Sequence, residues 1–413
     1  MAQRTSASSE RVCGDVDERY GKVADAFRQN LASGEEVGAA VTVYRDGRKV
    51  VDLWGGFRNG TTGAPWTKDT IVNAFSTTKG PAALTVALAV SRGLLDYDAR
   101  VADYWPEFAQ GGKEAVTVRQ LLAHQAGLPV IKPLLTLADI AVPERLSERL
   151  AAQVPAWTPG TRHGYHGVTL GWYESELIRH VDPQGRTLGK YFADEIAGPL
   201  GLNFHIGLPD SVDRDRVAHL HVPSQTATLL HLHVLPPRLA AAWFIPTTLT
   251  AQAGVAFEGA TGLSTFNRED VRVVEIPAAN GTGTAESVAR LYGDAAIGGA
   301  GIGLTPEVFA ALTAPAVRPM KGLRDKVLHV DTLFSLGFGR PIRELTTKYV
   351  IGSSDRAFGA PGAGGSVGFA DPDTGVGFGY LMNKLGFHFI SDPRAVRLRQ
   401  ALFRDVLGAR PQS

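Results

Sequence analysis

Apolar and polar residues alternate in two neighbouring runs within residues 38–57, GAAVTVYRDGRKVVDLWGGF. Alternation with a period of two is typical of a half-buried β-strand. Asp46-Gly47 lies between the runs, and this dipeptide favours the positive φ angles of a tight hairpin turn. The pattern therefore predicts a β-hairpin. Residues 366–383 predict a second pair of strands near the other end of the chain, joined by the turn-forming sequence DPDTG at 371–375.

Helical periodicity marks the segments that lie outside and between these strand pairs. The segment 81–92 is apolar almost throughout. Pro81 suits the first turn of a helix and Gly93 suits its end, so a buried helix is expected here. Four other segments have the apolar pattern of helices. Helices are therefore predicted at 20–31, 81–92, 118–123, 191–200 and 393–407.

Strand patterns at both ends of the chain, with helical patterns between them, favour one architecture. An α/β fold with an antiparallel sheet built from both termini, flanked by helices, accommodates this order if a large, mainly helical region is inserted. The α/β part is predicted at about 20–80 and 326–413, the insert at about 81–325, and a polar N-terminal tail at 1–19. No internal repeat or low-complexity linker divides 20–413, so a single domain is expected.

Composition places the chain among ordinary globular proteins, because 44% of its 413 residues are hydrophobic and 20% are charged. The net charge is +1 and there is no long basic run. Nucleic acid is not an expected partner, since phosphate binding requires clustered Lys and Arg. The most apolar long stretch, 229–249, is interrupted by prolines and is not expected to span a membrane.

The first twenty residues lack the apolar core of a secretory signal. Cys13 is the single cysteine, so no disulfide can form within the chain. Both features suit a reducing compartment, and the sequence predicts a cytoplasmic protein. It leaves the oligomeric state open.

Ser76-Thr77-Thr78-Lys79 lies where a polar segment enters the helix predicted at 81–92. Residues three apart share a helix face, so the serine hydroxyl and the lysine amine can meet. A serine hydroxyl is a weak nucleophile until a neighbouring base takes its proton, and a partly desolvated amine can do this. By itself the motif also fits an N-cap serine with a solvated lysine, so its meaning depends on the sequence around it.

The surrounding sequence contains a series of landmarks in a defined order. They are DTIVNAFSTTKG at 69–80, GLLDYDARVADYWPEF at 93–108, VTVRQLLAHQAGL at 116–128, TPGTRHGYHGVTLGW at 158–172, PLGL at 199–202 and FGAPGAGGSVGFADPDTGVGFGYLMN at 358–383. In this order they resemble the serine β-lactamase and penicillin-binding-protein superfamily, in particular class C β-lactamases and family VIII carboxylesterases. The resemblance extends from Val37 to the C-terminal helix.

This resemblance implies a β-lactamase/DD-peptidase-like fold, with one catalytic domain over 20–413. It makes Ser76 the nucleophile that forms an acyl-enzyme, and it gives Lys79 and Tyr165 the shared work of base and acid. The oxyanion is expected between the backbone N–H groups of Ser76 and Ala363. Substrate contacts are expected at His166, Gly167, Ala360, Gly362 and Gly364.

Two landmarks depart from the family pattern. Tyr165-His166-Gly167 stands in place of Tyr-x-Asn, and Ala360-Pro361-Gly362 stands in place of Lys-Thr-Gly or His-x-Gly. The asparagine that would hold an acyl amide and the cation that would bind a substrate carboxylate are both missing. β-Lactam hydrolysis and D-Ala-D-Ala recognition are therefore disfavoured, and a neutral ester or acyl donor fits better. His163 and His166 flank the tyrosine and can line the pocket or serve as structural histidines.

Two further patterns invite other interpretations. Gly-x-Ser-x-Gly at 364–368 matches the nucleophile elbow of α/β-hydrolases, but a strand pattern follows Ser366 where that elbow requires a helix. His231 and His233 have the spacing of metal ligands, but no Cys or carboxylate completes a site. The histidine segment fits a pocket wall or lid, and 239–245 fits apolar packing or an acyl-binding surface. Neither a metal nor a cofactor is expected.

The sequence thus predicts a carboxylesterase-like serine hydrolase that cleaves a small-molecule ester through a Ser76 acyl-enzyme. The alternative is an acyltransferase or transacylase that delivers the same acyl group to an amine or alcohol, because both reactions share the first half. A third interpretation is an inactive binding protein on the same scaffold. Ala360 supports it, and the combination of Ser76, Lys79 and Tyr165 argues against it.

Overall fold

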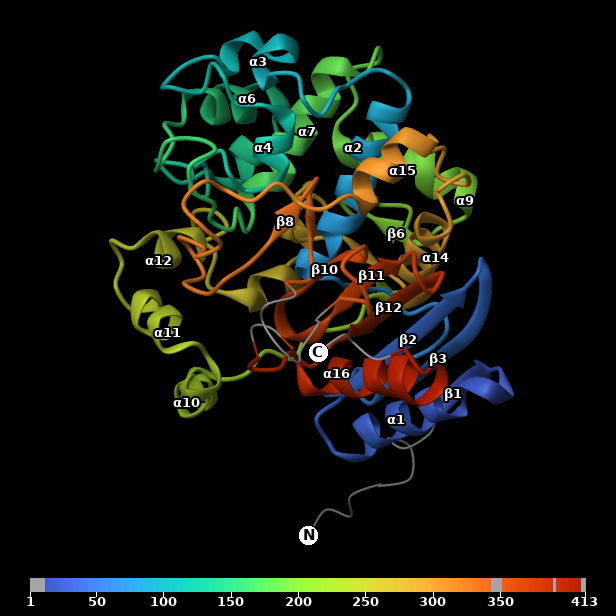
Figure 1. Ribbon diagram of the computed structural model, residues 1–413. Coiled ribbons are helices and arrows are strands. Elements are labelled where there is room, and N and C mark those ends of the chain that lie inside the picture. Colours follow the sequence, from blue (N-terminus) through green and yellow to red (C-terminus); the bar gives the residue numbers. More distant parts are fainter. Residues whose placement is uncertain (1–11, 343–350, 389–390, 410–413) are drawn as a thin grey trace.

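A nine-stranded antiparallel sheet forms the centre of the computed structural model, which describes residues 12–342, 351–388 and 391–409. The strands are β1 (Val12–Val16), β2 (Gly38–Arg45), β3 (Arg48–Asn59), β4 (Ala64–Pro65), β8 (Phe334–Ser335), β9 (Phe338–Gly339), β10 (Phe358–Pro361), β11 (Val367–Asp371) and β12 (Val376–Met382). Their order is β1-β3-β2-β12-β11-β10-β9-β8, and β4 also pairs with β3. The two ends of the chain meet where β2 pairs with β12, from Ala39 opposite Met382 to Arg45 opposite Val376. The predicted sheet from both termini is confirmed (Figure 1).

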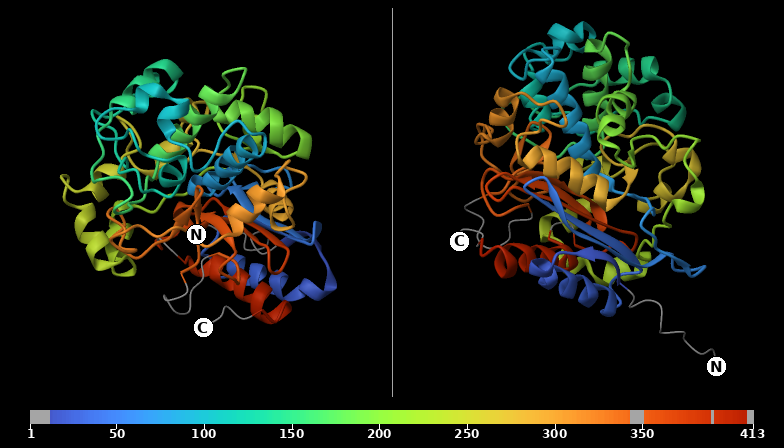
Figure 2. Two further views of the ribbon diagram at one scale, coloured as in Figure 1. Left: turned by 45° about the horizontal axis from the view of Figure 1, so that its top comes forward. Right: turned by 90° about the vertical axis from the view of Figure 1, so that its right-hand side faces the viewer.

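Helices cover both faces of this sheet. On one face, α14 (Ala285–Ala296) packs against β2, β11 and β12. On the other face, α1 (Gly21–Ala32) packs against α16 (Pro393–Gln400) and the π-helical turn Ala401–Val406 that follows it. The right-hand view of Figure 2 shows the sheet between these two layers. The resulting α/β sandwich is the predicted fold class.

Close packing of α14 on the sheet depends on glycine. A Cβ atom at Gly377 of β12 would lie 2.1 Å from the backbone nitrogen of Gly293 on the helix. A side chain at Gly377 would therefore force the helix away from the strand and open the core between them. Behind this contact Phe369 and Phe378 stack with ring centroids 4.9 Å apart.

Two boundaries differ from the sequence prediction. Residues 12–16, predicted to lie in the N-terminal tail, form the edge strand β1, which pairs with β3 from Val12 opposite Gly55 to Val16 opposite Val51. This strand is held by main-chain hydrogen bonds, and its sequence has no alternating apolar pattern. The sequence therefore did not predict it. Helix α14 lies within the range predicted as insert, 81–325, but it covers the sheet. The α/β part therefore has a third segment.

The helical part surrounds one buried helix. α2 (Lys79–Ser91) is buried on nearly all sides, as its apolar sequence predicts, and it follows a single 3₁₀ turn, Phe75–Thr78. The predicted helix at 118–123 is α4 (Val118–Leu122), and the one at 191–200 is formed by the end of α8 (Leu188–Phe192), a π-helical turn and α9 (Gly198–Leu200). The remaining elements are α3 (Val101–Tyr104), α4 (Val118–Leu122), α5 (Leu137–Ile140), α6 (Pro143–Ala152), α7 (Thr169–Val181), α8 (Leu188–Phe192), α9 (Gly198–Leu200), α10 (Gln225–Leu230), α11 (Pro237–Trp243), α12 (Leu249–Ala253), α13 (Glu269–Arg272), α15 (Pro306–Thr313) and a small sheet of β5 (Val72–Asn73), β7 (Thr282–Gly283) and β6 (Phe204–His205).

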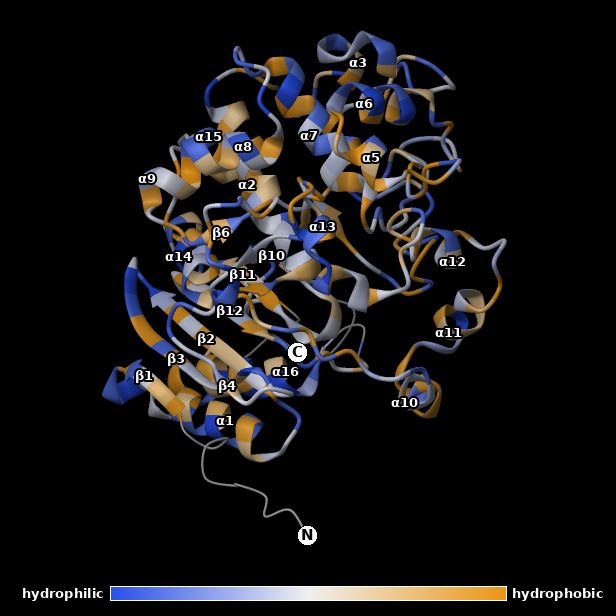
Figure 3. Cartoon of the chain, turned by 180° about the vertical axis from the view of Figure 1, so that it is seen from behind, coloured by the Kyte–Doolittle hydropathy of each residue, from blue (hydrophilic) through white to orange (hydrophobic). Residues whose placement is uncertain are grey.

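Helices α10, α11 and α12 project at one edge of the molecule, as Figure 3 shows. Leu230, Trp243 and Phe244 in this projection are half or more exposed. Among the residues that the structure describes, none of the helices combines the length and the apolarity that a bilayer crossing requires.

Candidate active site

Ser76 lies in the short 3₁₀ turn that precedes α2. Phe75, directly before it, has a φ angle of +48°, a conformation that costs energy in a residue with a side chain and that concentrates at functional sites. The Phe75 and Thr77 side chains are buried on either side, whereas Ser76 is partly exposed. The turn therefore presents the Ser76 hydroxyl at the surface of a cavity.

Lys79 begins α2 and its side chain is 3% exposed. Its Nζ donates hydrogen bonds to the carbonyl oxygens of Gly167, at 2.6 Å, and Ala278, at 2.9 Å. A third, longer bond of 3.3 Å leads to Ser76 Oγ. The two carbonyls fix the direction of the amine, so that its remaining position faces the serine. In the neutral amine, this position is the lone pair that can accept the Ser76 proton.

Tyr165 also contacts Ser76. Its Oη donates a hydrogen bond of 2.9 Å to Ser76 Oγ. Its ring stacks on Phe334 with centroids 5.7 Å apart, and Lys79 Nζ lies 4.9 Å from the ring centroid. The structure therefore brings the three predicted catalytic side chains into one hydrogen-bonded group, although 89 positions separate the serine and the tyrosine in the chain.

The loop after β10 forms the opposite wall of the site. Ala360 within β10 and Gly362 and Ala363 after it line the cavity that contains Ser76, so all three can contact a bound substrate. Gly364 is different, because it does not line this cavity. Its carbonyl oxygen instead accepts hydrogen bonds from the Gly386 N–H, at 2.9 Å, and from Arg394 Nη2, at 2.6 Å. The predicted substrate contact at Gly364 is thus corrected to a structural one.

The prediction of a substrate contact also fails for His166. This side chain is completely buried; its Nε2 accepts a hydrogen bond from the Leu128 N–H at 2.8 Å, and its Nδ1 donates to the Gly164 carbonyl at 2.7 Å. Burial lowers the pKa of His166 to about 3, so the ring is neutral near pH 7. His163 is also buried, with Nε2 2.8 Å from Thr332 Oγ1. Both histidines are structural.

Two participants were not predicted from the sequence. His124 lines the cavity, and its Nδ1 accepts a hydrogen bond of 3.0 Å from the His166 N–H. Burial lowers the pKa of His124 well below its ordinary value, so it contributes no charge there. Ala278 contributes only its carbonyl, for which no side-chain pattern exists. His124 belongs to the landmark at 116–128, where it could have been noticed.

Two apolar cavities meet at Ser76. The larger has a volume of about 530 Å³ and the smaller about 290 Å³. Ser76, Tyr165, Leu328 and Ala363 line both of them. The walls of the smaller cavity include Phe75, Gly167, Val168, Leu239, Trp243, Leu263, Phe266 and Ala279.

The smaller cavity connects the site to the projecting helices. Leu239 and Trp243 of α11 form part of its wall. Apolar packing and an acyl-binding surface were both expected for 239–245, and this position is compatible with either of them. His231 stacks on Phe387, with ring centroids 3.8 Å apart, and so holds α10 against the body of the protein.

Ser366 does not lie at a nucleophile elbow. Strand β11 follows it, and its buried hydroxyl donates a hydrogen bond of 2.9 Å to the Ala74 carbonyl. It lines neither of the two cavities. Nor do three His, Cys, Asp or Glu side chains come together in a metal-binding arrangement anywhere in the described part of the chain.

Comparison with known proteins adds to this geometry. Residues 23–402 match the Beta-lactamase family. The chain belongs to the beta-lactamase family. Esterase/beta-lactamase LipL of Mycobacterium tuberculosis (strain ATCC 25618 / H37Rv) is 36% identical over 387 residues, which cover 91% of this chain and 83% of LipL.

Two solved structures share the fold. A family VIII carboxylesterase is 37% identical, with a TM-score of 0.81 and coverage of 95% of this chain and 99% of that one. A penicillin-binding protein homologue from Caulobacter crescentus is 39% identical, with a TM-score of 0.80 and the same coverage. The resemblance and the fold predicted from the landmarks are confirmed.

Proposed function

We propose that this member of the beta-lactamase family is a serine hydrolase that cleaves a neutral small-molecule ester through an acyl-enzyme on Ser76. One observation carries the proposal: Ser76 Oγ lies within hydrogen-bond distance of both Lys79 Nζ and Tyr165 Oη, at the junction of two apolar cavities. The names of the relatives, an esterase/beta-lactamase and a family VIII carboxylesterase, support the same reaction.

The reaction has two halves. Ser76 Oγ attacks the ester carbonyl carbon, and its proton passes to the unprotonated member of the pair, which is either the neutral Lys79 amine or the Tyr165 phenolate. The bond between the carbonyl carbon and the alcohol oxygen then breaks, the alcohol leaves with that proton, and the acyl group stays on the serine. A water molecule attacks the acyl-enzyme and gives a proton to the same pair. The bond from the acyl carbon to Ser76 Oγ then breaks, Oγ takes that proton back, and the acid is released. The N–H groups of Ser76 and Ala363 stabilise the oxyanion in both halves.

The charges around the larger cavity favour a neutral substrate. Two arginines line it, but Arg324 pairs with Asp331 at 2.7 Å. Arg340 donates to backbone carbonyls, including that of Asp355 at 2.8 Å. Ala360 stands where the family pattern implied by the sequence landmarks has Lys or His. Lys79 also lines the cavity, but its amine is already held by Ser76 and by the Gly167 and Ala278 carbonyls. A substrate carboxylate would therefore have to compete with existing partners for these cations, whereas an uncharged acyl or alcohol group gains from burial.

Product analysis tests hydrolysis against acyl transfer. The wild-type protein is incubated with a p-nitrophenyl ester of a short-chain acid, with and without a panel of primary amines, and the products are identified by mass spectrometry. We expect the free acid as the main product in both cases, because hydrolysis is the proposed reaction. A stable amide that outcompetes the acid would establish the acyltransferase alternative instead.

The phenol of Tyr165 is expected to be necessary for rapid turnover. Tyr165→Phe keeps the ring and its stacking on Phe334 but removes the oxygen that contacts Ser76. General acid–base groups contribute roughly 10²- to 10⁴-fold, and because Lys79 shares the role we expect kcat to fall about 10²-fold. Steady-state kinetics would measure the loss. A kcat equal to that of the wild type would exclude the phenol from proton transfer.

A further inference from the structure

The loop between β10 and β11 is a tight turn with Ala363 at its tip. The Gly362 N–H donates a hydrogen bond of 2.7 Å to the Ser366 carbonyl, and the Gly365 N–H donates one of 3.2 Å to the Gly362 carbonyl. These bonds close the turn, but they do not set its position relative to Ser76. That position depends on contacts made by the rest of the loop.

On its inner side, the loop is hydrogen-bonded to the turn that carries Ser76. The Ser366 hydroxyl donates a hydrogen bond of 2.9 Å to the Ala74 carbonyl and accepts one of 3.2 Å from Thr77 Oγ1. Ala74 and Thr77 flank the proposed nucleophile. A Cβ atom at Gly362 would lie 2.2 Å from Ser366 Oγ and 2.5 Å from the Ala74 carbonyl oxygen. The two segments are therefore in direct contact through this hydroxyl.

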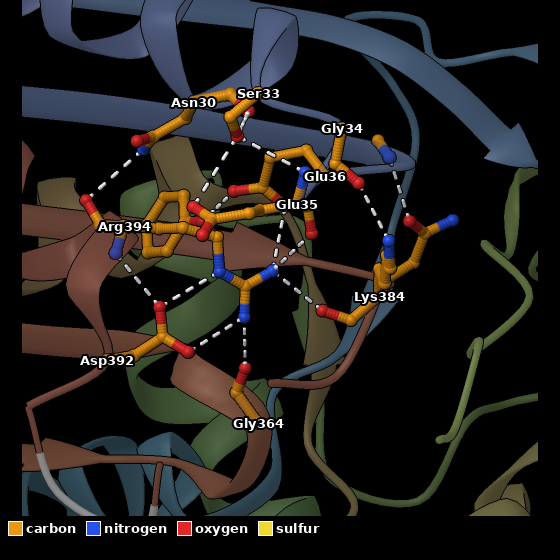
Figure 4. Close-up of polar contacts among 12 residues, drawn as sticks. Asn30, Ser33, Gly34, Glu35, Glu36, Gly364, Lys384, Asp392 and Arg394 are labelled. Atoms are coloured by element: carbon orange, nitrogen blue, oxygen red, sulfur yellow. Dashed lines mark hydrogen bonds and ion pairs between the residues drawn. The ribbon is translucent and has the colours of Figure 1, made fainter. Parts of the chain in front are cut away.

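On its outer side, the loop is held by Arg394, which is 3% exposed. Its Nη2 donates to the Gly364 carbonyl at 2.6 Å, and Nε and Nη2 contact the two carboxylate oxygens of Asp392 at 2.9 Å. Its Nη1 donates to Glu36 Oε2 at 3.1 Å and to the Lys384 carbonyl at 2.8 Å. Figure 4 shows how these partners surround the guanidinium and fix it. The Gly364 peptide thus meets a rigid, buried cation.

We propose that Ser366 and Arg394 are positioning residues, which together set the distance between the N–H groups of Ser76 and Ala363. The inference rests on the proposed acyl-enzyme reaction. Oxyanion donors work only when they are preorganised at hydrogen-bond distance from the developing charge, and displacements well below 1 Å weaken them. Ser366 therefore acts through Ala74 and Thr77, and Arg394 through Gly364. Neither touches the substrate.

Ser366→Ala removes one buried hydroxyl and is the first test. We expect kcat for a p-nitrophenyl ester to fall roughly 10- to 100-fold with KM changed less than about 3-fold, since the loss affects the transition state. Affinity for a trifluoromethyl ketone, which forms a tetrahedral adduct, should fall by the same factor as kcat/KM. A fluorophosphonate should still label Ser76, more slowly. Arg394→Lys, which cannot contact Gly364 and Asp392 together in the same planar geometry, should show the same pattern.

Ser353→Ala is the matched control. Ser353 is also a buried serine, and its hydroxyl donates a hydrogen bond of 2.7 Å to Asp371 Oδ2 at the far end of β11. Its loss should lower the melting temperature without changing kcat, so a reduced kcat in the Ser366 variant cannot be attributed to lost stability. If Arg394→Lys does not fold, Ser366→Ala alone decides the question.

The outcomes separate the inference from the proposed function. An active wild type, an inactive Ser76→Ala and a Ser366→Ala with unchanged kcat would overturn the positioning role alone. A fall in kcat without a matching loss of ketone affinity would also overturn it. If the wild type neither hydrolyses the ester nor reacts with the fluorophosphonate, the proposed function fails first.

Discussion

Ser76→Ala is expected to abolish ester hydrolysis and covalent labelling together. The variant should keep the fold, because among the described residues the partly exposed hydroxyl is hydrogen-bonded only by Lys79 and Tyr165, at the cavity surface. Removing a nucleophile eliminates the acyl-enzyme pathway, and what remains is transition-state binding without covalent catalysis. We expect kcat to fall by at least about 10⁴-fold.

Intact-protein mass spectrometry makes this test independent of the natural substrate. Wild type and variant are incubated with a fluorophosphonate and, separately, with an activated short-chain ester. We expect one covalent adduct on the wild type and none on Ser76→Ala. An adduct that persists on the variant would refute the assignment and direct attention to Ser366. If neither probe forms an adduct on the wild type, the proposal that Ser76 reacts with neutral acyl donors is contradicted.

Much of the sheet could be predicted because its signals are local. Alternating residues and the Asp46-Gly47 turn define β2 and β3, and the pairing of the two ends follows from the order of strands and helices along the chain. Edge strand β1 could not be predicted in the same way. Its residues pair through the backbone, and two of the five, Gly14 and Asp15, are exposed to solvent on the sheet edge, so no apolar pattern marks them.

The residues of the candidate site differ in how far the sequence alone could predict them. Ser76 and Lys79 are three residues apart, so helix geometry alone brings them together. Tyr165 lies far away in the chain, and only the family likeness connects it to them. The structural roles of His166 and Gly364 depend on hydrogen-bond partners that no local sequence pattern reveals, namely the Leu128 N–H and the Arg394 guanidinium. A polar residue beside a catalytic one can point into the pocket or into the core, and tertiary packing decides which.

Glu174 is a buried acid that the proposed reaction does not use. It lies on α7 with its side chain completely buried, and neither of its carboxylate oxygens has a hydrogen-bond partner among the residues that the structure describes. A Cβ atom at Gly337, in the cavity wall, would lie 3.0 Å from its Oε1. Burial raises its pKa from 4.5 to about 8, although the positive charge of Lys79 acts to lower it. Glu174 is therefore protonated in the folded protein at neutral pH.

This protonation makes the wild-type protein less stable as the pH rises. Between pH 4.5 and about 8 the unfolded chain carries an ionised Glu174 and the folded chain keeps the proton, so unfolding releases a proton. The free energy of unfolding then falls by about 1.4 kcal/mol per pH unit, or roughly 5 kcal/mol over the whole interval. Glu174→Gln has no proton to release. Its stability should be similar to that of the wild type near pH 5 and clearly higher at pH 8.

Urea unfolding at pH 5, 6.5 and 8 measures this difference. The exposed Glu148 on α6 provides the matched control, because Glu148→Gln makes the same chemical change in contact with solvent and should leave the pH dependence unaltered. A constant difference between Glu174→Gln and the wild type at all three values would mean that the carboxyl group is already ionised in the folded protein. Lys79 is the cation whose charge acts on this carboxyl group, so this result would place a buried negative charge behind the wall of the proposed active site. In that case Glu174→Gln should also change the pH dependence of kcat, whereas a protonated, uncharged Glu174 leaves it unchanged below pH 7.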